Sequence, residues 1–562
     1  MATQTMPNPP IPKTYQFGDP TPNAVGRKAM VSHDGCVVYL EKKSAPRLLW
    51  YGEDVLAVKM PAGTREVYPN PTIPGLRDPE GAIRYALAHP EGMEPLEALL
   101  KPGMKITIAI DDISLPLPKM RRPDIRETAL TILLEMLVGK GIEDFHIVIA
   151  TSYHRRMTPF EIKRAVGGKI FREYYPDQLY NFDGEAPGGV VELGVTDHGE
   201  HARISRRAAE SDLLIYVNIN LVPMDGGSKS VGVGLCDYAT LQAHHNPQTI
   251  LDCDSYLDNA RSAMARSCDR IAAIISQKLK VFHIETVLNN AMFEKTMAFF
   301  FKNEDHYSPY DRAMFGATRF ALSKMSRPLK RRILFGVPAP YRMIAVHAGA
   351  TQPVHDRTLA YCYSQYCVPI QGQTDVVVQG IPFIMPYNVN SIMNPLLVQT
   401  MALGYFHNMY RGMPVVKKNG VSIITHPVYD EFDPLHHPSY IEFFHRLLPE
   451  TRDSFELQRK YEAEFAHNPD YIRMYRTGNA YHGVHPFYMW YWGENGRAHV
   501  GKVIAVGAED PKVPAVMGWE SATCMEQALE MAESYVGHKP SITLMHNAPI
   551  NMVDVLGTPE NC

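Results

Sequence analysis

The sequence predicts an α/β fold built on a parallel sheet with helices on both faces. A strand–helix–strand pattern spans 105–150, and a similar pattern spans 375–425. Between them, Leu213–Ile219 is an apolar strand with no polar face. Such runs are typical of parallel strands covered by helices on both sides.

The first unit is the clearest element of the sequence. Lys105–Ile110 is short and β-branched, as strands are, and Phe145–Ala150 repeats that pattern. Between them, Pro123–Val138 carries apolar residues at i, i+4, i+7 and i+8, which predicts a helix with one buried face. Gly139 follows and favours the end of the helix. A connection of this kind predicts two parallel strands with a right-handed crossover.

The remaining elements are shorter and predict a second unit with flanking segments. We expect five further strands, at 35–40, 54–60, 375–379, 421–425 and 541–545. We expect two further helices, at 394–404 and 524–536. We divide the chain into an N-terminal catalytic and cofactor domain (1–365), a C-terminal α/β domain (366–515) and a return segment (516–562) that packs on the N-terminal domain. The aromatic and basic stretch 291–340 lacks clear periodicity and reads as an insertion or cap.

Composition predicts a cytoplasmic globular enzyme. The 562 residues hold 56 Lys and Arg against 60 Asp and Glu, a net charge of −4, which argues against nucleic acid or an acidic membrane as partner. No apolar run approaches the ~20 residues that a membrane span needs. The stretch Met1–Thr14 is polar and Pro-rich, unlike a secretory signal. The eight cysteines include no CxxC pair and read as reduced thiols.

Polar side chains follow the three strands of the predicted N-terminal sheet. Because ligands bind beyond the carboxyl ends of strands in open α/β sheets, we expect Asp112, His154 and Lys229 to converge on one site. The clusters that contain them are 111–114, 151–154 and 225–230.

These residue types suit catalysis and cofactor binding. His154 can act as a general base near neutral pH. Lys229 follows Gly226 and Gly227, which allow close backbone approach, and its amine can serve as a point charge or a nucleophile. The loop lacks the first glycine of a phosphate-binding GxxxxGK[ST] motif, and no GxGxxG or GxSxG motif follows a strand.

Other histidine clusters are less specific. With 23 histidines in the chain, chance pairs are expected. We interpret Asp197–His201 as a surface turn, since it is neither HExxH nor HxxEH. His436-His437 and His482-x-x-His485 read as loop residues.

Four motifs together resemble the nickel-dependent lactate racemases. Asp112–Pro118 resembles their Asp-His-Thr-Arg-Pro-x-Pro segment, and Ala150–Arg155 resembles Ala-Thr-Gly-x-His-Arg. Gly226–Ser230 resembles Gly-Gly-Arg-Lys-Ser, and Ala239–His245 resembles the following Glu-Thr-Ile-Met-x-Asn-His with the same spacing from lysine to histidine. Each motif alone is weak, but all four occur in order, and the resemblance is clearest over 105–290.

The resemblance implies a nickel-pincer nucleotide as cofactor, a pyridinium-3,5-bisthiocarboxylic acid mononucleotide that carries nickel. It implies that His154 is the catalytic base, that His245 is the protein ligand to nickel, and that the fold is a two-domain lactate-racemase-like architecture with the active site in the interdomain cleft. The cofactor-binding residues that it implies are Asp112, Ser114, Gly226, Gly227 and Lys229.

The predicted function is therefore racemisation or epimerisation of a small 2-hydroxy acid through a 2-keto intermediate. Hydride leaves C2 for the cofactor and returns to the opposite face. The partners implied are this substrate and the proteins that synthesise the cofactor. Two alternatives stay open: a non-racemising oxidoreductase that uses the same cofactor, and a catalytically silent cofactor-binding homologue.

Two departures from the family pattern concern the substrate and the second base. Leu115 stands where the family has an arginine expected to hold the substrate carboxylate, so a substrate other than or larger than lactate is expected. The family's second catalytic histidine, about ten residues before the lysine, has no counterpart here. The residues that might replace the arginine are Arg121, Arg122, Arg155 and Arg156, and those that might replace the histidine are Asp225, His198, His244 or a residue of the second domain.

Overall fold

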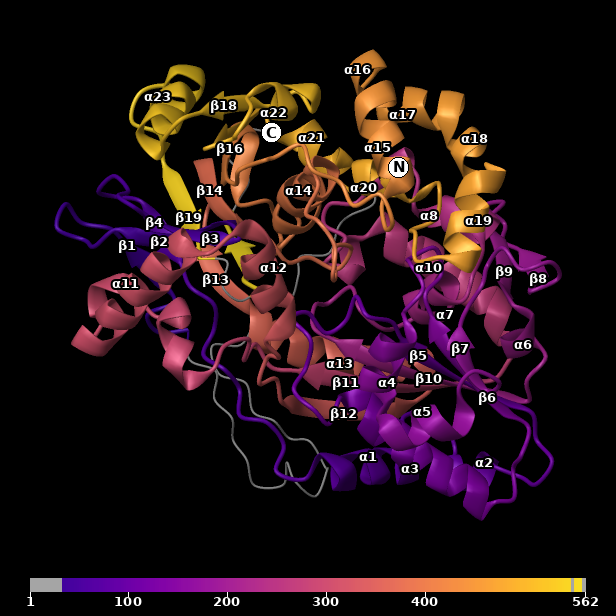
Figure 1. Ribbon diagram of the computed structural model, residues 1–562. Coiled ribbons are helices and arrows are strands. Elements are labelled where there is room, and N and C mark those ends of the chain that lie inside the picture. The colour runs from indigo at the N-terminus through magenta and orange to yellow at the C-terminus, as the bar shows by residue number, and fades with distance from the viewer. Residues whose placement is uncertain (1–32, 547–549, 558–562) are drawn as a thin grey trace.

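The computed structural model describes residues 33–546 and 550–557 and has a mixed α/β fold with mostly parallel sheets flanked by helices (Figure 1). The six-stranded sheet has the order β12-β11-β10-β5-β6-β7, and only β12 runs antiparallel to its neighbour. Its strands are β5 (Ile106–Asp111), β6 (Phe145–Ala150), β7 (Leu179–Asn181), β10 (Leu213–Asn220), β11 (Val281–Leu288) and β12 (Met343–Gly349). The predicted α/β class is therefore confirmed.

The predicted strand–helix–strand unit is present with nearly the predicted bounds. β5 and β6 pair in parallel, and α3 (Ile125–Gly139) connects them. The helix begins two residues later than predicted because Asp124 caps it, its side chain accepting a hydrogen bond from the Arg126 backbone N–H. The predicted apolar face is buried, and this burial fixes the helix on the sheet.

A larger sheet joins segments from both ends of the described chain. Its order is β1-β4-β19-β14-β16-β17-β18, with the β2–β3 hairpin paired to β14. Its strands are β1 (Val37–Tyr39), β2 (Arg47–Gly52), β3 (Asp54–Val58), β4 (Arg65–Val67), β14 (Thr374–Pro382), β16 (Val416–Thr425), β17 (Lys502–Val506), β18 (Glu520–Ala522) and β19 (Ile542–Met545). All five strands predicted outside the N-terminal sheet are thus present, and the sequence analysis missed β2, β4, β17 and β18.

The strand pairing mixes the segments that the sequence separates. β4 lies in the range assigned to the N-terminal domain, yet it pairs with β19 of the return segment. β19 pairs on its other edge with β14. Periodicity predicts that a strand exists but carries no information on its partner, so the boundaries at 365 and 515 stay a prediction.

Both helices predicted outside the first unit are present, and one of them changes from α-helical to π-helical geometry along its length. α23 (Met525–Val536) matches the predicted closing helix. α14 (Pro395–Gln399) starts after the cap Asn394 and continues as the π-helical segment η4 (Thr400–Phe406). Every residue of η4 is buried.

The 291–340 insertion contains two helices that sequence periodicity did not predict. α11 (Pro309–Lys324) buries only Asp311, and α12 (Arg327–Gly336) buries no residue fully. Both helices therefore lie largely on the surface of the molecule. Both helices lie beside β3 in Figure 1, and α11 contacts that strand.

No helix of the described residues is long and apolar enough to cross a membrane. Every cysteine in this part of the chain is a free thiol, and only Cys524 is exposed. Cys562 and the stretch 1–14 lie outside the described residues.

Candidate active site

Asp112 and His154 form the centre of the site at the ends of β5 and β6. Asp112 Oδ2 lies 2.8 Å from His154 Nδ1. The other carboxylate oxygen, Oδ1, accepts hydrogen bonds from the backbone N–H and the hydroxyl of Ser114, at 2.9 and 2.5 Å. Parallel pairing of β5 with β6 brings these loops together, as the sequence predicted.

The electrostatics of this pair make His154 suited to accept a proton. Burial works to raise the pKa of Asp112, but His154 and the Ser114 hydrogen bonds outweigh it and lower that pKa. An ionised Asp112 accepts the hydrogen bond from Nδ1–H of His154. The lone pair of a neutral His154 imidazole is then on Nε2, where a general base needs it.

Arg126 fixes the chain that carries Asp112. Its guanidinium donates to the backbone oxygens of Asp111 and Asp112, at 2.9 and 2.6 Å. Asp124, which caps the same helix, holds the guanidinium through two further bonds of 2.9 Å. By holding these two backbone oxygens, Arg126 fixes the position from which the Asp112 side chain extends.

Lys229 begins α7 (Lys229–Gly234), and its amine has no hydrogen-bond or ion-pair partner among residues 33–546 and 550–557. Burial lowers its pKa, although Asp225 and Asp111 oppose this. The shift increases the fraction of neutral amine, which is the nucleophilic form. The charge of Lys229 also contributes, after burial and His244, to lowering the pKa of His245.

The glycines before Lys229 allow the loop backbone to pack closely against neighbouring side chains. Gly226 and Gly227 have φ of +81° and +62°. A Cβ on Gly226 would lie 2.5 Å from the side-chain oxygen of Asn220, and one on Gly227 would lie 2.7 Å from the ring of His355. The Gly227 N–H donates to Glu285 at 2.6 Å. These contacts explain the glycines structurally, and their predicted cofactor role stays a prediction, as does that of Ser114.

His245 lies at the end of α8 (Tyr238–His244), where a chain of hydrogen bonds fixes its tautomer. His244 Nε2 lies 3.0 Å from the backbone oxygen of Gly232. A carbonyl only accepts, so His244 carries its proton on Nε2 and its Nδ1 is an acceptor. His244 Nδ1 lies 2.7 Å from His245 Nδ1, which must therefore donate. The lone pair of His245 is consequently on Nε2.

Burial keeps both imidazoles neutral. It lowers the pKa of His244 to about 4, and burial together with His244, Lys229 and His154 lowers that of His245 well below its ordinary value. A neutral imidazole with a defined free lone pair is the form that binds a metal ion. Of the two adjacent histidines, His245 is thus the one that can be a ligand.

Aromatic and imidazole rings from the second half of the chain cover these groups. Tyr387 and His485 lie edge-on to His154, with ring centroids 5.2 and 5.6 Å away. Trp492 stacks on His245 at 5.1 Å. The site is therefore built from segments more than 200 residues apart in the sequence, which no local pattern could bring together.

His485 is the site residue that the sequence interpretation missed. It begins the buried helix α20 (His485–Tyr491) and is not a loop residue, so that interpretation is wrong. Its Nδ1 lies 2.5 Å from the Tyr440 hydroxyl. Burial, and after it His154, lowers the pKa of His485, whose ring lies 5.6 Å from that of His154. The spacing His482-x-x-His485 was the only feature of the sequence that pointed to this histidine.

The other histidine clusters have structural explanations. His198, in the turn between β8 (Val190–Val195) and β9 (His201–Ser205), is exposed, as predicted for a surface turn. His437 is buried, with Nε2 3.0 Å from the Tyr387 backbone oxygen. Of the other candidates for a second base, both nitrogens of His244 are hydrogen-bonded, and Asp225 accepts from the backbone of Leu221 and Val222.

The arginines considered for the substrate carboxylate already have acidic partners. Arg155 is buried, binds Glu161 through two nitrogens at 3.0 and 2.8 Å, and donates to the Val389 backbone oxygen. The remaining ion pairs are Arg121–Glu294, Arg122–Glu127 and Arg156–Asp183. The structure therefore offers no free arginine from this set.

Fold and candidate site together define an α/β protein with an imidazole–carboxylate pair, a lysine amine whose pKa is lowered, and a neutral imidazole whose Nε2 is free. Residues 51–255 match the family model of the lactate racemase N-terminal domain. A lactate racemase of Lactiplantibacillus plantarum is 27% identical over 173 residues, which is 30% of this chain and 38% of that protein.

A solved structure shares the fold over most of the chain. The lactate racemase apoprotein of Thermoanaerobacterium thermosaccharolyticum aligns with 91% of this chain and 100% of its own, with a TM-score of 0.57 and 17% identity. The chain is thus similar to lactate racemases in sequence over residues 51–255 and in fold over most of its length.

Proposed function

We propose that this protein is a nickel-pincer-nucleotide-dependent racemase or epimerase of a 2-hydroxy acid. The observation that carries the proposal is the tautomer of His245, whose Nε2 lone pair is free. A base held by a carboxylate, Asp112–His154, lies at the ends of β5 and β6.

The residues present fit the cofactor that the family resemblance implies. His245 would hold nickel, because its imidazole is neutral and Nε2 is not used by His244. Lys229 would attach the nucleotide, because burial favours its neutral amine. When bound, the cofactor supplies an electrophile that accepts a hydride from C2 of the substrate.

His154 takes the substrate hydroxyl proton in this proposal. Its Nε2 accepts the proton, and the ionised Asp112 stabilises the imidazolium through the 2.8 Å contact to Nδ1. The aromatic side chains around the imidazole restrict its position but leave it partly exposed, so the proton on Nε2 can be returned to the substrate. Positioned acid–base catalysis of this kind contributes roughly 10²–10⁴-fold to a rate.

His485 is our candidate for the second base. Racemisation needs a proton acceptor for each enantiomer, and among the described residues of the second half His485 lies against His154. Its partner, the Tyr440 hydroxyl, can donate to or accept from Nδ1. Nε2 of His485 can therefore either carry or receive a proton, as a group that acts in both directions must.

The substrate is proposed to be a 2-hydroxy acid larger than lactate. Leu115 packs partly buried against the core in place of the family arginine. The rings of Tyr387, Tyr481 and Trp492 surround the two site histidines and favour an apolar or aromatic substituent at C2.

The test is a chiral assay on a 2-hydroxy acid deuterated at C2, with protein produced in cells that make the cofactor. Racemisation with internal hydride return predicts the opposite enantiomer with deuterium kept at C2. His154→Gln abolishes it, whereas His198→Gln, an exposed histidine, leaves it unchanged. Accumulation of a keto acid would support an oxidoreductase instead, and unchanged substrates would support a silent cofactor-binding protein.

A further inference from the structure

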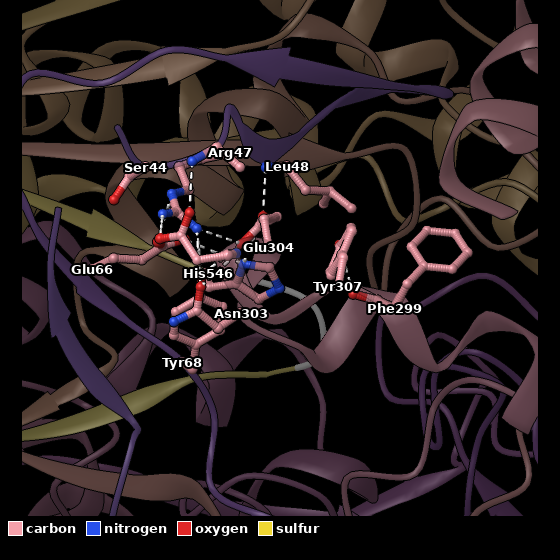
Figure 2. A network of polar contacts seen from close by, with 12 residues as sticks. Ser44, Arg47, Leu48, Glu66, Tyr68, Phe299, Asn303, Glu304, Tyr307 and His546 are labelled. Carbon is pink, nitrogen blue, oxygen red and sulfur yellow. Dashed lines mark hydrogen bonds and ion pairs between the residues drawn. The ribbon is translucent and has the colours of Figure 1, made fainter. Parts of the chain in front are cut away.

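A second group of buried charged side chains shares no residue with the candidate active site (Figure 2). Arg47 comes from β2, Glu66 from β4, and Glu304 from the short helix η3 (Glu304–His306). His546 directly follows β19. None of the four side chains is more than 2% exposed. Four separate parts of the chain thus meet at one dehydrated point.

The polar atoms at the centre of this cluster lack partners. His546 Nε2 lies 2.7 Å from the Phe300 backbone oxygen, so this nitrogen carries the proton. Nδ1 of His546 then faces Glu66 Oε1 at 3.6 Å and Glu304 Oε1 at 3.9 Å. Within the described residues, neither this Nδ1 nor either oxygen of Glu66 has a hydrogen-bond partner. A lone pair that faces two carboxylates needs a positive centre between them.

The distances from His546 Nδ1 to the two carboxylate oxygens suit a shared metal ion better than a shared proton. An N–H···O hydrogen bond is about 2.7–3.2 Å long, shorter than both contacts of Nδ1. A tetrahedral ion with bonds of roughly 2.0–2.2 Å holds its ligands about 3.3–3.6 Å apart. The three ligand atoms of Glu66, Glu304 and His546 all lie within 4.8 Å of one another.

The outward atoms of these side chains are held as metal ligands usually are. Oε2 of Glu304 accepts from the Tyr68 hydroxyl at 2.5 Å and from Arg47 at 3.2 Å, while Oε1 accepts from the Leu48 N–H at 2.7 Å. Arg47 Nε lies 3.3 Å from Oε2 of Glu66. Figure 2 shows these residues, with dashed lines for the hydrogen bonds and ion pairs between them. Such outer contacts orient a ligand. Oε1 of Glu304 keeps a second lone pair that can bind the ion.

We propose that Glu66, Glu304 and His546 bind one divalent transition-metal ion, with Zn²⁺ as the best match to one imidazole and two carboxylates. Two carboxylates against one guanidinium leave net negative charge at the buried centre, which favours a cation. The ion would join β2, β4, the 291–340 insertion and the segment after β19. It is separate from any nickel at His245.

The test uses the full chain made in cells that lack the pincer cofactor. After the protein is stripped with a chelator, Zn²⁺ is titrated in competition with a chromogenic chelator, and the thermal midpoint is followed. We expect one equivalent of Zn²⁺ per chain, a higher midpoint, and an X-ray absorption spectrum with nitrogen and oxygen ligands. His546→Gln weakens binding by more than 100-fold, and Tyr68→Phe by roughly 10–100-fold, as for an outer contact.

His245→Ala is the matched control, because it removes a buried imidazole elsewhere and leaves Zn²⁺ binding unchanged. Absence of binding by the wild-type chain to both Zn²⁺ and Mn²⁺ would overturn the proposal and assign a proton to His546. Equal binding by wild type and His546→Gln, or sulfur ligands in the spectrum, would do the same. The wild-type titration stands even where a variant does not fold.

Discussion

Replacement of His244 by leucine tests whether the histidine chain controls the metal ligand. His244→Leu removes the acceptor for His245 Nδ1–H and the donor to the Gly232 oxygen. The Nδ1 proton of His245 is then free to move to Nε2, the position that must bind nickel. Loss of such an outer contact weakens metal binding roughly 10–100-fold, which is about 1.4–2.7 kcal/mol.

The same substitution has a cost in stability. It leaves one N–H and one carbonyl buried without partners, at about 1–3 kcal/mol each. We therefore expect the free energy of unfolding to fall by roughly 2–6 kcal/mol.

His244→Asn separates the two effects. Its side-chain oxygen takes the place of Nδ1 and accepts from His245, but it does not reach the Gly232 oxygen. The assay measures nickel per chain during a chelator challenge of cofactor-loaded protein, alongside urea unfolding. Both variants lose stability, and only His244→Leu loses nickel faster than wild type. Equal nickel retention by the two variants would refute the tautomer argument.

Three further predictions concern the base, a buried ion pair and acid stability. Asp112→Asn keeps the fold but lowers kcat by roughly 10²–10⁴-fold in the chiral assay, because the base loses its anionic partner. Glu161→Gln leaves the buried Arg155 guanidinium without its partner and lowers the free energy of unfolding by about 3–5 kcal/mol, measured in urea. Stability falls as the pH drops from about 6.5 toward 4, by roughly 1 kcal/mol per buried neutral imidazole at one unit below 6.5, because only the unfolded chain takes up these protons. His355, whose pKa is raised, partly opposes this slope, which pH-dependent urea midpoints measure. The imidazoles whose pKa burial lowers to about 3 or 4 are His244, His283, His407, His426 and His437.

The sequence predicts the parts of the site that depend on one sheet edge. Asp112 and His154 follow strands that are neighbours in a parallel unit, so topology alone brings them together. Their contact required no knowledge of packing between distant segments.

The rest of the site depends on contacts that leave no local pattern. His485 and Trp492 meet the strand ends from the other half of the chain, and their sequence neighbourhood resembles an ordinary buried aromatic helix. The tautomer of His245 depends on the Gly232 carbonyl, twelve residues before its partner His244. Strand pairing between β4 and β19 is equally invisible to periodicity.

The central claim is tested most directly by intact mass and nickel content of the protein from cells that synthesise the pincer cofactor. The account predicts nearly one nickel per chain and a mass increment that disappears in Lys229→Ala, with nickel also lost in His245→Ala. A wild-type protein with neither nickel nor mass increment, or variants that retain both, would contradict it.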